Sequence, residues 1–330
     1  MKYRMDKKDR LLPSYKVQSP ILFITFCRPN TTLIVFEQIR AAKPSKLYLA
    51  QNIPSNKSEK ELESWNEVRR VIESVDWDCE VVKLYREKHL SAKDSISSAI
   101  NWFFENESEG IIMEDDVEPS SDFFRFCDYS LNRYRTDTRI GMITGNNLLG
   151  DRMSSSEYIY SQTFSIWGWA TWRRAWKLYD PEMRSWPCKW QRDSLNYRFK
   201  KDLANYYRYT FDSYTDDNID TWDIQWLHSC LFNNFLCIIP KANMISNIGI
   251  EGAHSSVETP NHNKSYGTVP GLKFNAPKKI VADPYYDERM TKSIFKPALT
   301  MQKYSRLTKK LGIHGVAKVI YRMLYGKLSK

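Results

Sequence analysis

Residues 110–124 read Gly-Ile-Ile-Met-Glu-Asp-Asp-Val-Glu-Pro-Ser-Ser-Asp-Phe-Phe. A short apolar run, typical of a buried strand, leads directly into three carboxylates, Glu114, Asp115 and Asp116. In open α/β sheets, ligands bind beyond the carboxyl ends of the strands. Adjacent carboxylates repel one another unless a cation lies among them, and their oxygens suit Mg²⁺ or Mn²⁺. The stretch therefore predicts a divalent-metal site, with an acidic turn that caps a helix starting near Ser120–Asp122 as the alternative.

The residues before this stretch alternate between strand-like and helix-like segments. Strands are expected at Pro20–Phe26, Lys46–Ala50, Glu80–Leu84 and Gly110–Met113. Helices are expected between them, at Thr31–Arg40, Lys60–Ser74 and Asp94–Phe104. This alternation with short connections predicts an α/β fold, a Rossmann-like sheet flanked by helices. No GxGxxG follows the first strand, so a dinucleotide cofactor is not expected.

Beyond about residue 150 the pattern is less regular and richer in aromatic side chains. We expect strands at Tyr158–Ser165 and Phe235–Pro240, and helices near 191–211, 222–233 and 304–328. Trp169, Trp172 and Trp176 follow helical spacing, which favours a packed helix face. The chain is accordingly divided into a polar lead-in (1–19), a catalytic domain (20–285, with a nucleotide-binding half to about residue 150 and an acceptor half after it), and a basic helical extension (286–330).

Composition and charge exclude several classes of protein. The chain has 330 residues, 14% aromatic, and a net charge of +10. The excess charge lies in residues 291–330, which hold ten Lys and Arg and no Asp or Glu. No apolar run approaches the length of a spanning helix, and the polar first 20 residues do not resemble a secretory signal. Six scattered cysteines without CxxC spacing favour a reducing compartment, so a cytoplasmic protein is expected.

The basic extension contains an amphipathic helical pattern. From Leu311 to Leu328, apolar residues recur at helical spacing, with Lys318 and Arg322 on the opposite face. Such a helix is typical of contact with an anionic membrane surface. A helix packed on the catalytic domain is the alternative. No nucleic-acid recognition motif accompanies the charge, so nucleic acid is not an expected partner.

The acidic stretch, with its Asp-Phe-Phe sequel, resembles the metal motif of GT-A fold glycosyltransferases, in particular N-acetylglucosaminyltransferase I and its relatives in glycosyltransferase family 13. Residues 20–28 resemble that family's first strand, which ends in a nucleotide-contacting arginine. Trp167-Gly-Trp is similar to its Gly-Trp segment, Trp222-Asp-Ile-Gln-Trp226 to the stretch that carries its catalytic base, and residues 240–254 to the loop that follows. The resemblance spans roughly residues 20–256.

The resemblance implies a role for each matching residue. Asp116 would bind Mn²⁺ or Mg²⁺, Asp115 would face the ribose or the metal shell, and Glu114 the sugar. Arg28 would pair with phosphate or base, because its forked donors suit oxyanions. Asp223 would be the base that deprotonates an acceptor hydroxyl, its basicity raised by neighbouring tryptophans such as Trp222.

Several of these assignments have alternatives. Asn52 stands where the family has an acidic uracil-reading residue, and it is equally a turn asparagine. Asp220 is the rival of Asp223 as base, and Asp223 could instead be a first-turn acid of a helix. His254 is a metal ligand or phosphate contact, or an exposed loop residue. Lys93 reaches phosphate or lies at the surface, and Trp167 and Trp169 line a sugar site or pack in the core.

Together these features predict a metal-dependent inverting glycosyltransferase, located in the cytoplasm at the inner face of the membrane. It would move a sugar such as N-acetylglucosamine from a nucleotide-sugar donor to a glycan or lipid-linked acceptor of surface polysaccharide. Two alternatives stay open: a metal-dependent nucleotidyltransferase or phosphohydrolase, and a non-catalytic glycan- or lipid-binding protein.

Overall fold

The computed structural model describes residues 15–55, 58–150, 156–217, 219–249 and 274–311. The chain divides into two compact units. Unit 1 comprises residues 1–183 and 220–283, and unit 2 comprises residues 184–219 and 284–330. The domain boundaries expected from the sequence stay predictions.

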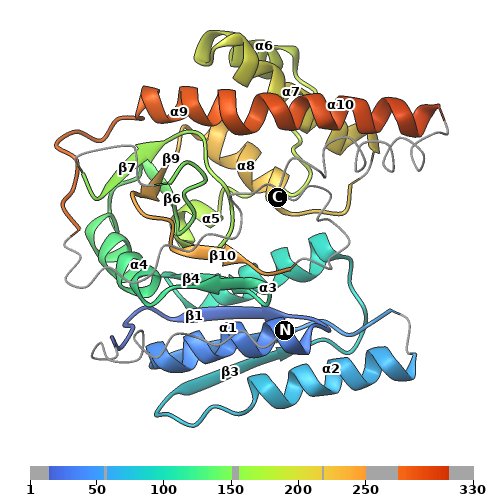
Figure 1. Ribbon diagram of the computed structural model, residues 1–330, viewed down its shortest axis with the longest axis vertical. Coiled ribbons are helices and arrows are strands. Elements are labelled where there is room, and N and C mark those ends of the chain that lie inside the picture. The colour runs from blue at the N-terminus through green and yellow to red at the C-terminus, as the bar shows by residue number, and fades with distance from the viewer. Residues whose placement is uncertain (1–14, 56–57, 151–155, 218, 250–273, 312–330) are drawn as a thin grey trace, which may run out of the picture. The chain divides into compact units, whose positions relative to one another are not determined.

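The first half of unit 1 is a parallel sheet, as the alternating pattern predicts. Its strands are β1 (Ile21–Thr25), β2 (Lys46–Gln51), β3 (Glu80–Tyr85) and β4 (Glu109–Glu114). The helices that join them are α1 (Pro29–Ala42), α2 (Glu59–Ile72) and α3 (Ala92–Asn106). The strands pair in the order β3-β2-β1-β4, all in parallel (Figure 1).

Both faces of this sheet are buried. Phe23 of β1 packs on Phe36 of α1, with 6.5 Å between the ring centroids. On the opposite face, Tyr48 of β2 packs edge-on against Phe103 of α3 at 4.9 Å. Because successive strand side chains alternate between faces, a strand covered by helices on both sides is expected to be mostly apolar. All five residues of β1 are buried; the first four are apolar, and Thr25 at the end donates a hydrogen bond from Oγ1 to the carbonyl oxygen of Ala50.

The sheet continues beyond β4 with strands of mixed direction. The added strands are β6 (Ile140–Thr144), β7 (Tyr158–Ser161), β8 (Trp169–Trp172) and β9 (Leu236–Pro240). β8 lies between β4 and β6 and is antiparallel to both. Three further helices belong to this part, α4 (Ser121–Arg133), α5 (Arg173–Trp176) and α8 (Asp223–Phe232). The predicted fold class, a mixed Rossmann-like α/β sheet flanked by helices, is confirmed.

A small two-stranded sheet lies after the acidic stretch. β5 (Val117–Pro119) pairs antiparallel with β10 (Ile245–Asn247). This pairing joins the chain just past Asp116 to a segment more than 120 residues later. It brings Gly249 close to Asp116, as described below.

The helix predicted from the spacing of Trp169, Trp172 and Trp176 is wrong for its first two members. Trp169 and Trp172 are the ends of strand β8, and α5 begins only at Arg173. The spacing of three residues puts these two side chains on opposite faces of the strand. Pairing with β4 and β6 on both sides overrides the helical pattern. The strand expected at Tyr158–Ser165 is also shorter than predicted, since β7 ends at Ser161.

Unit 2 is helical in its described part. It consists of α6 (Lys189–Arg198), α7 (Lys201–Asp217), α9 (Pro284–Met290), a π-helical turn (Thr291–Phe295) and α10 (Lys296–Lys310). The single helix expected near 191–211 is two helices, because Phe199 is extended and ends α6. Except for Leu311, the predicted stripe from Leu311 to Leu328 lies outside the described residues. Among the helices that are described, none is long and apolar enough to span a membrane.

Candidate functional site

The turn between β1 and α1 presents Arg28 to the acidic stretch. Pro29 occupies the first turn of α1, where its fixed backbone angle favours helix initiation. The carbonyl oxygen of Arg28 accepts hydrogen bonds from the backbone N of Thr32 at 2.9 Å and from its Oγ1 at 2.7 Å. These bonds fix the backbone at the point where the arginine side chain leaves it.

Arg28 bridges two of the predicted site residues. Its Nη1 donates to Asp116 Oδ2 at 2.6 Å, and its Nη2 donates to Asp115 Oδ1. Burial alone would lower the pKa of Arg28, but the two carboxylates outweigh burial and raise it. The arginine therefore carries a permanent positive charge at the carboxyl ends of β1 and β4.

Asp115 holds the β1–α1 turn in place. Its side chain is only 2% exposed, and Oδ2 accepts a hydrogen bond from the backbone N of Phe26 at 2.9 Å. Burial raises the pKa of Asp115, with Arg28 acting in the opposite direction. The family resemblance implies a ribose- or metal-facing role for Asp115, but both of its carboxylate oxygens accept hydrogen bonds from the turn that carries Arg28.

Glu114 and Asp223 lie within electrostatic reach of each other. Burial raises the pKa of Glu114 to about 8, and the negative charges of Asp116 and Asp223 contribute in the same direction. Asp223 is exposed at the start of α8, where its Oδ1 accepts hydrogen bonds from Thr221 Oγ1 and, at 2.8 Å, from the backbone N of Ile224. The negative charge of Asp223 therefore favours the protonated form of Glu114, a residue 109 positions earlier in the sequence.

Replacing Glu114 by glutamine tests this environment. A carboxyl group whose pKa is raised on folding favours the folded state below its unfolded pKa and weakens it as the pH rises toward 8. We expect Glu114→Gln to unfold like the wild type at pH 4 and to be more stable by about 1–2 kcal/mol at pH 8. Urea denaturation at the two pH values measures the difference, and equal stabilities at both would contradict the raised pKa.

Asp116 is the best placed of the described residues to bind a divalent cation. Its side chain is 19% exposed and presents hard oxygen donors. The backbone at Gly249 passes so close that an added Cβ would lie 2.5 Å from Asp116 Oδ2. No group of three or more His, Cys, Asp or Glu side chains in the described part of the chain is arranged as a metal site. The residues fit an ion such as Mg²⁺, which typically takes one or two carboxylates and completes its shell with phosphates and water.

Asp220, the predicted rival of Asp223, caps a different helix. Its Oδ2 and Oδ1 accept hydrogen bonds from the backbone N atoms of Ala92 and Lys93, both at 2.9 Å. These are the first residues of α3, whose N-terminal N–H groups lack partners within the helix. Asp220 therefore fixes the segment before α8 to the start of α3, three residues from Asp223.

Replacing Asp220 by alanine removes this cap. We expect the free energy of unfolding to fall by about 1 kcal/mol, the usual cost of losing a helix cap. Asp220→Asn keeps an acceptor oxygen and is expected to lose less. Chemical denaturation of the three proteins measures the effect, and equal losses for the two variants would show that the cap is not the cause.

Two other predicted donor-binding residues have side chains that are already engaged. The Asn52 amide donates from Nδ2 to the carbonyl oxygen of Leu90 at 2.8 Å, and its Oδ1 accepts from the backbone N of Ile53 at 3.0 Å. These bonds are typical of a structural turn asparagine. The Lys93 Nζ pairs with Glu182 Oε1 at 2.8 Å.

The predicted tryptophans belong to an aromatic cluster behind Asp223. Trp169 is 1% exposed and stacks on Trp222, with ring centroids 5.5 Å apart. Trp226 packs against Trp169 from α8 at 5.8 Å. Trp167, two residues before Trp169, is half-buried and packs against the hydrophobic core. The remaining candidate, His254, lies outside the described residues.

Sequence reasoning missed the contacts that organise the site. The pairing of Arg28 with Asp115 and Asp116 joins residues 87 and 88 positions apart. The approach of Gly249 to Asp116 depends on the pairing of β5 with β10. The sequence does hold one signal for the Arg28 pairing. An arginine follows the first strand and carboxylates follow the fourth, and the ends of parallel strands lie at one edge of the sheet.

Comparison with known proteins reveals distant likenesses to solved structures. No protein-family model matches the chain, and no curated protein matches its sequence. HddC from Yersinia pseudotuberculosis is 8% identical and has a TM-score of 0.30, over 47% of this chain and 77% of that one. A 4-diphosphocytidyl-2C-methyl-D-erythritol synthase from Anaerococcus prevotii is 8% identical with a TM-score of 0.34, over 67% and 88%. A UDP-glucose pyrophosphorylase complexed with UDP-glucose is 8% identical with a TM-score of 0.29, over 49% and 78%.

These comparisons correct the predicted enzyme class. Of the structures named above, one is a 4-diphosphocytidyl-2C-methyl-D-erythritol synthase and one a UDP-glucose pyrophosphorylase, and none is named as a glycosyltransferase, which contradicts the predicted enzyme class. The identities and TM-scores are too low to transfer a substrate or a residue role. The chemistry must therefore be argued from the residues at the edge of the sheet.

Proposed function

We propose that this protein is a metal-dependent nucleotidyltransferase that binds a nucleotide at the carboxyl ends of β1 and β4. The observation that carries the proposal is the bridge from Arg28 to Asp115 and Asp116. It combines a permanent cation with carboxylates at the edge where open α/β sheets bind ligands. Nucleotide phosphates need this combination, because the arginine binds phosphate oxygens and the carboxylates bind the accompanying ion.

In this proposal Asp116 binds Mg²⁺ or Mn²⁺, and the exposed carboxylate of Asp223 contributes negative charge near it. The ion neutralises charge on the phosphates when it is bound. Arg28 keeps its charge throughout and donates to phosphate oxygens with its forked N–H groups. Asp115 is a positioning residue, since its buried carboxylate holds both Arg28 and the backbone of Phe26.

The nucleophile in this proposal belongs to the second substrate. An oxygen of a phosphorylated acceptor attacks the α-phosphorus of a nucleoside triphosphate, a new phosphoanhydride bond forms, and the bond to pyrophosphate breaks. A phosphate monoester is already largely ionised near neutral pH, so this attack needs no general base. Cys27, the thiol nearest to Arg28 in sequence, is not a competing nucleophile, because burial and nearby carboxylates raise its pKa to about 12.

The test is a panel assay with each nucleoside triphosphate, a set of sugar 1-phosphates, and Mg²⁺ or Mn²⁺. We expect pyrophosphate release that needs both the metal and one phosphorylated acceptor, together with a new diphosphate resonance in the ³¹P NMR spectrum. Release of inorganic phosphate without an acceptor would instead identify a phosphohydrolase. Binding without turnover would favour a non-catalytic protein, and transfer of the sugar from a nucleotide sugar would contradict nucleotidyl transfer.

We further propose that the basic extension contacts an anionic membrane surface. Residues 291–311 hold six Lys and Arg and no Asp or Glu; Lys292, Lys296 and Arg306 among them pair with acidic side chains of unit 2. Each basic side chain near an anionic surface contributes about 1 kcal/mol. A glycan or lipid-linked acceptor does not follow from nucleotidyl transfer and is not included.

A further inference from the structure

Helix α6 in unit 2 exposes two large aromatic side chains. Tyr197 is 90% exposed and Trp190 is 72% exposed, more than any other large apolar side chain in the described part of the chain. They lie seven residues apart, which places them on one line of the helix, about 10 Å from each other. Tryptophan is highly buried on average in folded proteins, so the exposure of Trp190 indicates a surface that contacts another molecule.

The side of α6 that faces away from Trp190 and Tyr197 packs against α7. Leu195 is fully buried. Arg192 Nη2 donates to Asp212 Oδ2 of α7 at 3.0 Å, and Arg208 of α7 donates to Asn196 Oδ1 at 2.9 Å. The inner side of the helix thus holds the buried Leu195 and hydrogen bonds to α7, while the outer side presents two aromatic residues to solvent.

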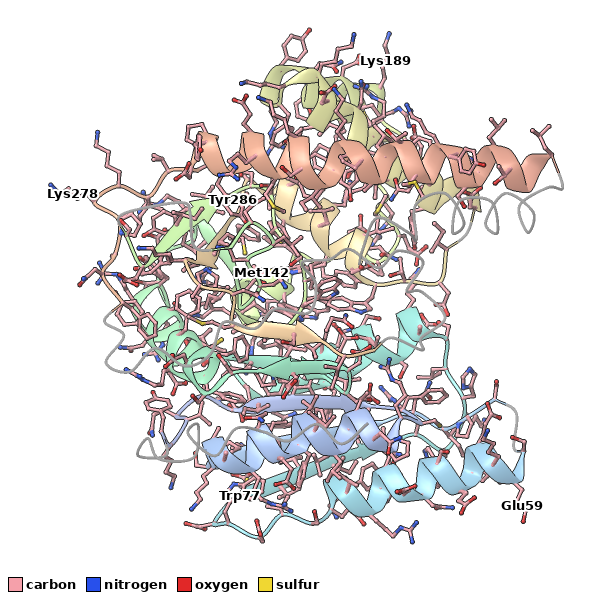
Figure 2. All side chains as sticks on the ribbon, viewed as in Figure 1. Glu59, Trp77, Met142, Lys189, Lys278 and Tyr286 are labelled. Atoms are coloured by element: carbon pink, nitrogen blue, oxygen red, sulfur yellow. The ribbon has the colours of Figure 1, made fainter. Side chains whose placement is uncertain are left out.

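Unit 2 also carries the net charge of the protein. It holds 18 Lys and Arg against seven Asp and Glu, while unit 1 holds 31 against 32. Exposed lysines lie at both ends of α6: Lys189 begins the helix (Figure 2), and Lys200, which pairs with Glu288 Oε2 at 2.8 Å, follows it. Asp193, also exposed, offsets one of these charges.

We infer that the outer side of α6 is a membrane-contacting surface that inserts Trp190 and Tyr197 among the headgroups of anionic lipids. Tryptophan and tyrosine favour the membrane–water interface, because an apolar ring and a polar tip match its two sides. The charge of unit 2 favours an anionic partner: without residues 312–330, which are not described, it still holds 14 Lys and Arg against seven Asp and Glu, an excess that attracts an anionic surface. α6 would be a second membrane-contacting segment besides the C-terminal extension, and this inference does not depend on nucleotidyl transfer.

Co-sedimentation of the full chain with sucrose-loaded vesicles tests the inference. We expect binding to vesicles that contain phosphatidylglycerol, weakened by salt, and little binding to phosphatidylcholine alone. The double variant Trp190→Ser/Tyr197→Ser keeps every basic residue and is expected to bind anionic vesicles about tenfold more weakly, since two aromatic side chains lose their apolar contact. Both side chains are exposed, so the variant is expected to fold normally, as circular dichroism would verify.

The matched control is Leu33→Ser/Ile34→Ser. These two exposed apolar residues lie on α1 in unit 1, and their loss is expected to leave vesicle binding unchanged. Equal vesicle binding by wild type and the α6 variant would overturn the inference, as would a tenfold loss in the α1 control. A change in oligomeric state of the α6 variant in analytical ultracentrifugation, with vesicle binding retained, would assign the surface to self-association and would also overturn it.

Discussion

Replacing Asp116 by asparagine is expected to reduce metal-dependent nucleotide binding and turnover by about 100-fold. The substitution keeps the size of the side chain and removes the charge that we assign to the divalent ion. Arg28 keeps its contact with Asp115, so the fold around the site is retained. Isothermal titration with a nucleoside triphosphate, with and without Mn²⁺, measures the loss directly.

Glu118→Gln is the matched control for this substitution. Glu118 lies in β5, two residues after Asp116 in the same acidic stretch, and is half-buried. We expect its replacement to leave the metal dependence of binding unchanged. If Asp116→Asn retains metal-dependent binding, or if Glu118→Gln loses it equally, Asp116 is not the residue that binds the ion.

Arg28→Ala is expected to have the largest effect on stability. It leaves the carboxylate of Asp115, which is almost fully buried, without its cation. Removing one partner of a fully buried ion pair costs about 3–5 kcal/mol, and the 37% exposure of Arg28 reduces the expected loss to about 2 kcal/mol. Urea denaturation at neutral pH measures it, and nucleotide binding should be lost at the same time.

The pH dependence of the stability of Arg28→Ala distinguishes an uncompensated charge on Asp115 from a simple loss of packing. Without Arg28 the pKa of Asp115 is expected to rise further, because burial already raises it. A carboxyl with a raised pKa in the folded state loses stability as the pH increases above its unfolded value, near 4. The defect of Arg28→Ala should therefore be small in acid and grow toward neutral pH. Arg28→Ala/Asp115→Asn should recover much of the loss at pH 7, and a double variant as unstable as the single one would contradict the charge argument.

The parallel half of the sheet could be predicted from the sequence because its physical requirements are local. β1 is buried on both faces and is apolar at its first four positions, and α1 and α2 show the periodicity of helices with one buried side. β8 could not be recognised in the same way. A spacing of three residues between Trp169 and Trp172 suits a helix face as well as the two faces of a strand, and only the neighbours β4 and β6 decide between them.

The site shows the same difference between local and distant information. The acidic stretch identified Asp115 and Asp116, but not that Asp115 is engaged by Arg28 and Phe26. Asp220 and Asp223 are equivalent as residues in a run of aspartates. They differ because Asp220 reaches the start of α3, 128 positions earlier. The contact of Asp220 with α3 follows from the topology of the fold and has no signal in the sequence, whereas the opposite charges of Arg28 and Asp115 are visible there.

The order of strands in the sheet has a consequence for synthesis. Every pairing among β1, β2, β3 and β4 joins residues within the first 114. This half of the sheet, together with Arg28 after β1 and Asp115 and Asp116 after β4, can therefore assemble while the rest of the chain is still being synthesised. The outer edge of β4 stays unpaired until β8 is made, some 55 residues later. During that interval an apolar strand edge is open to other chains. A nascent chain that pauses before Trp169 is therefore most in need of a chaperone.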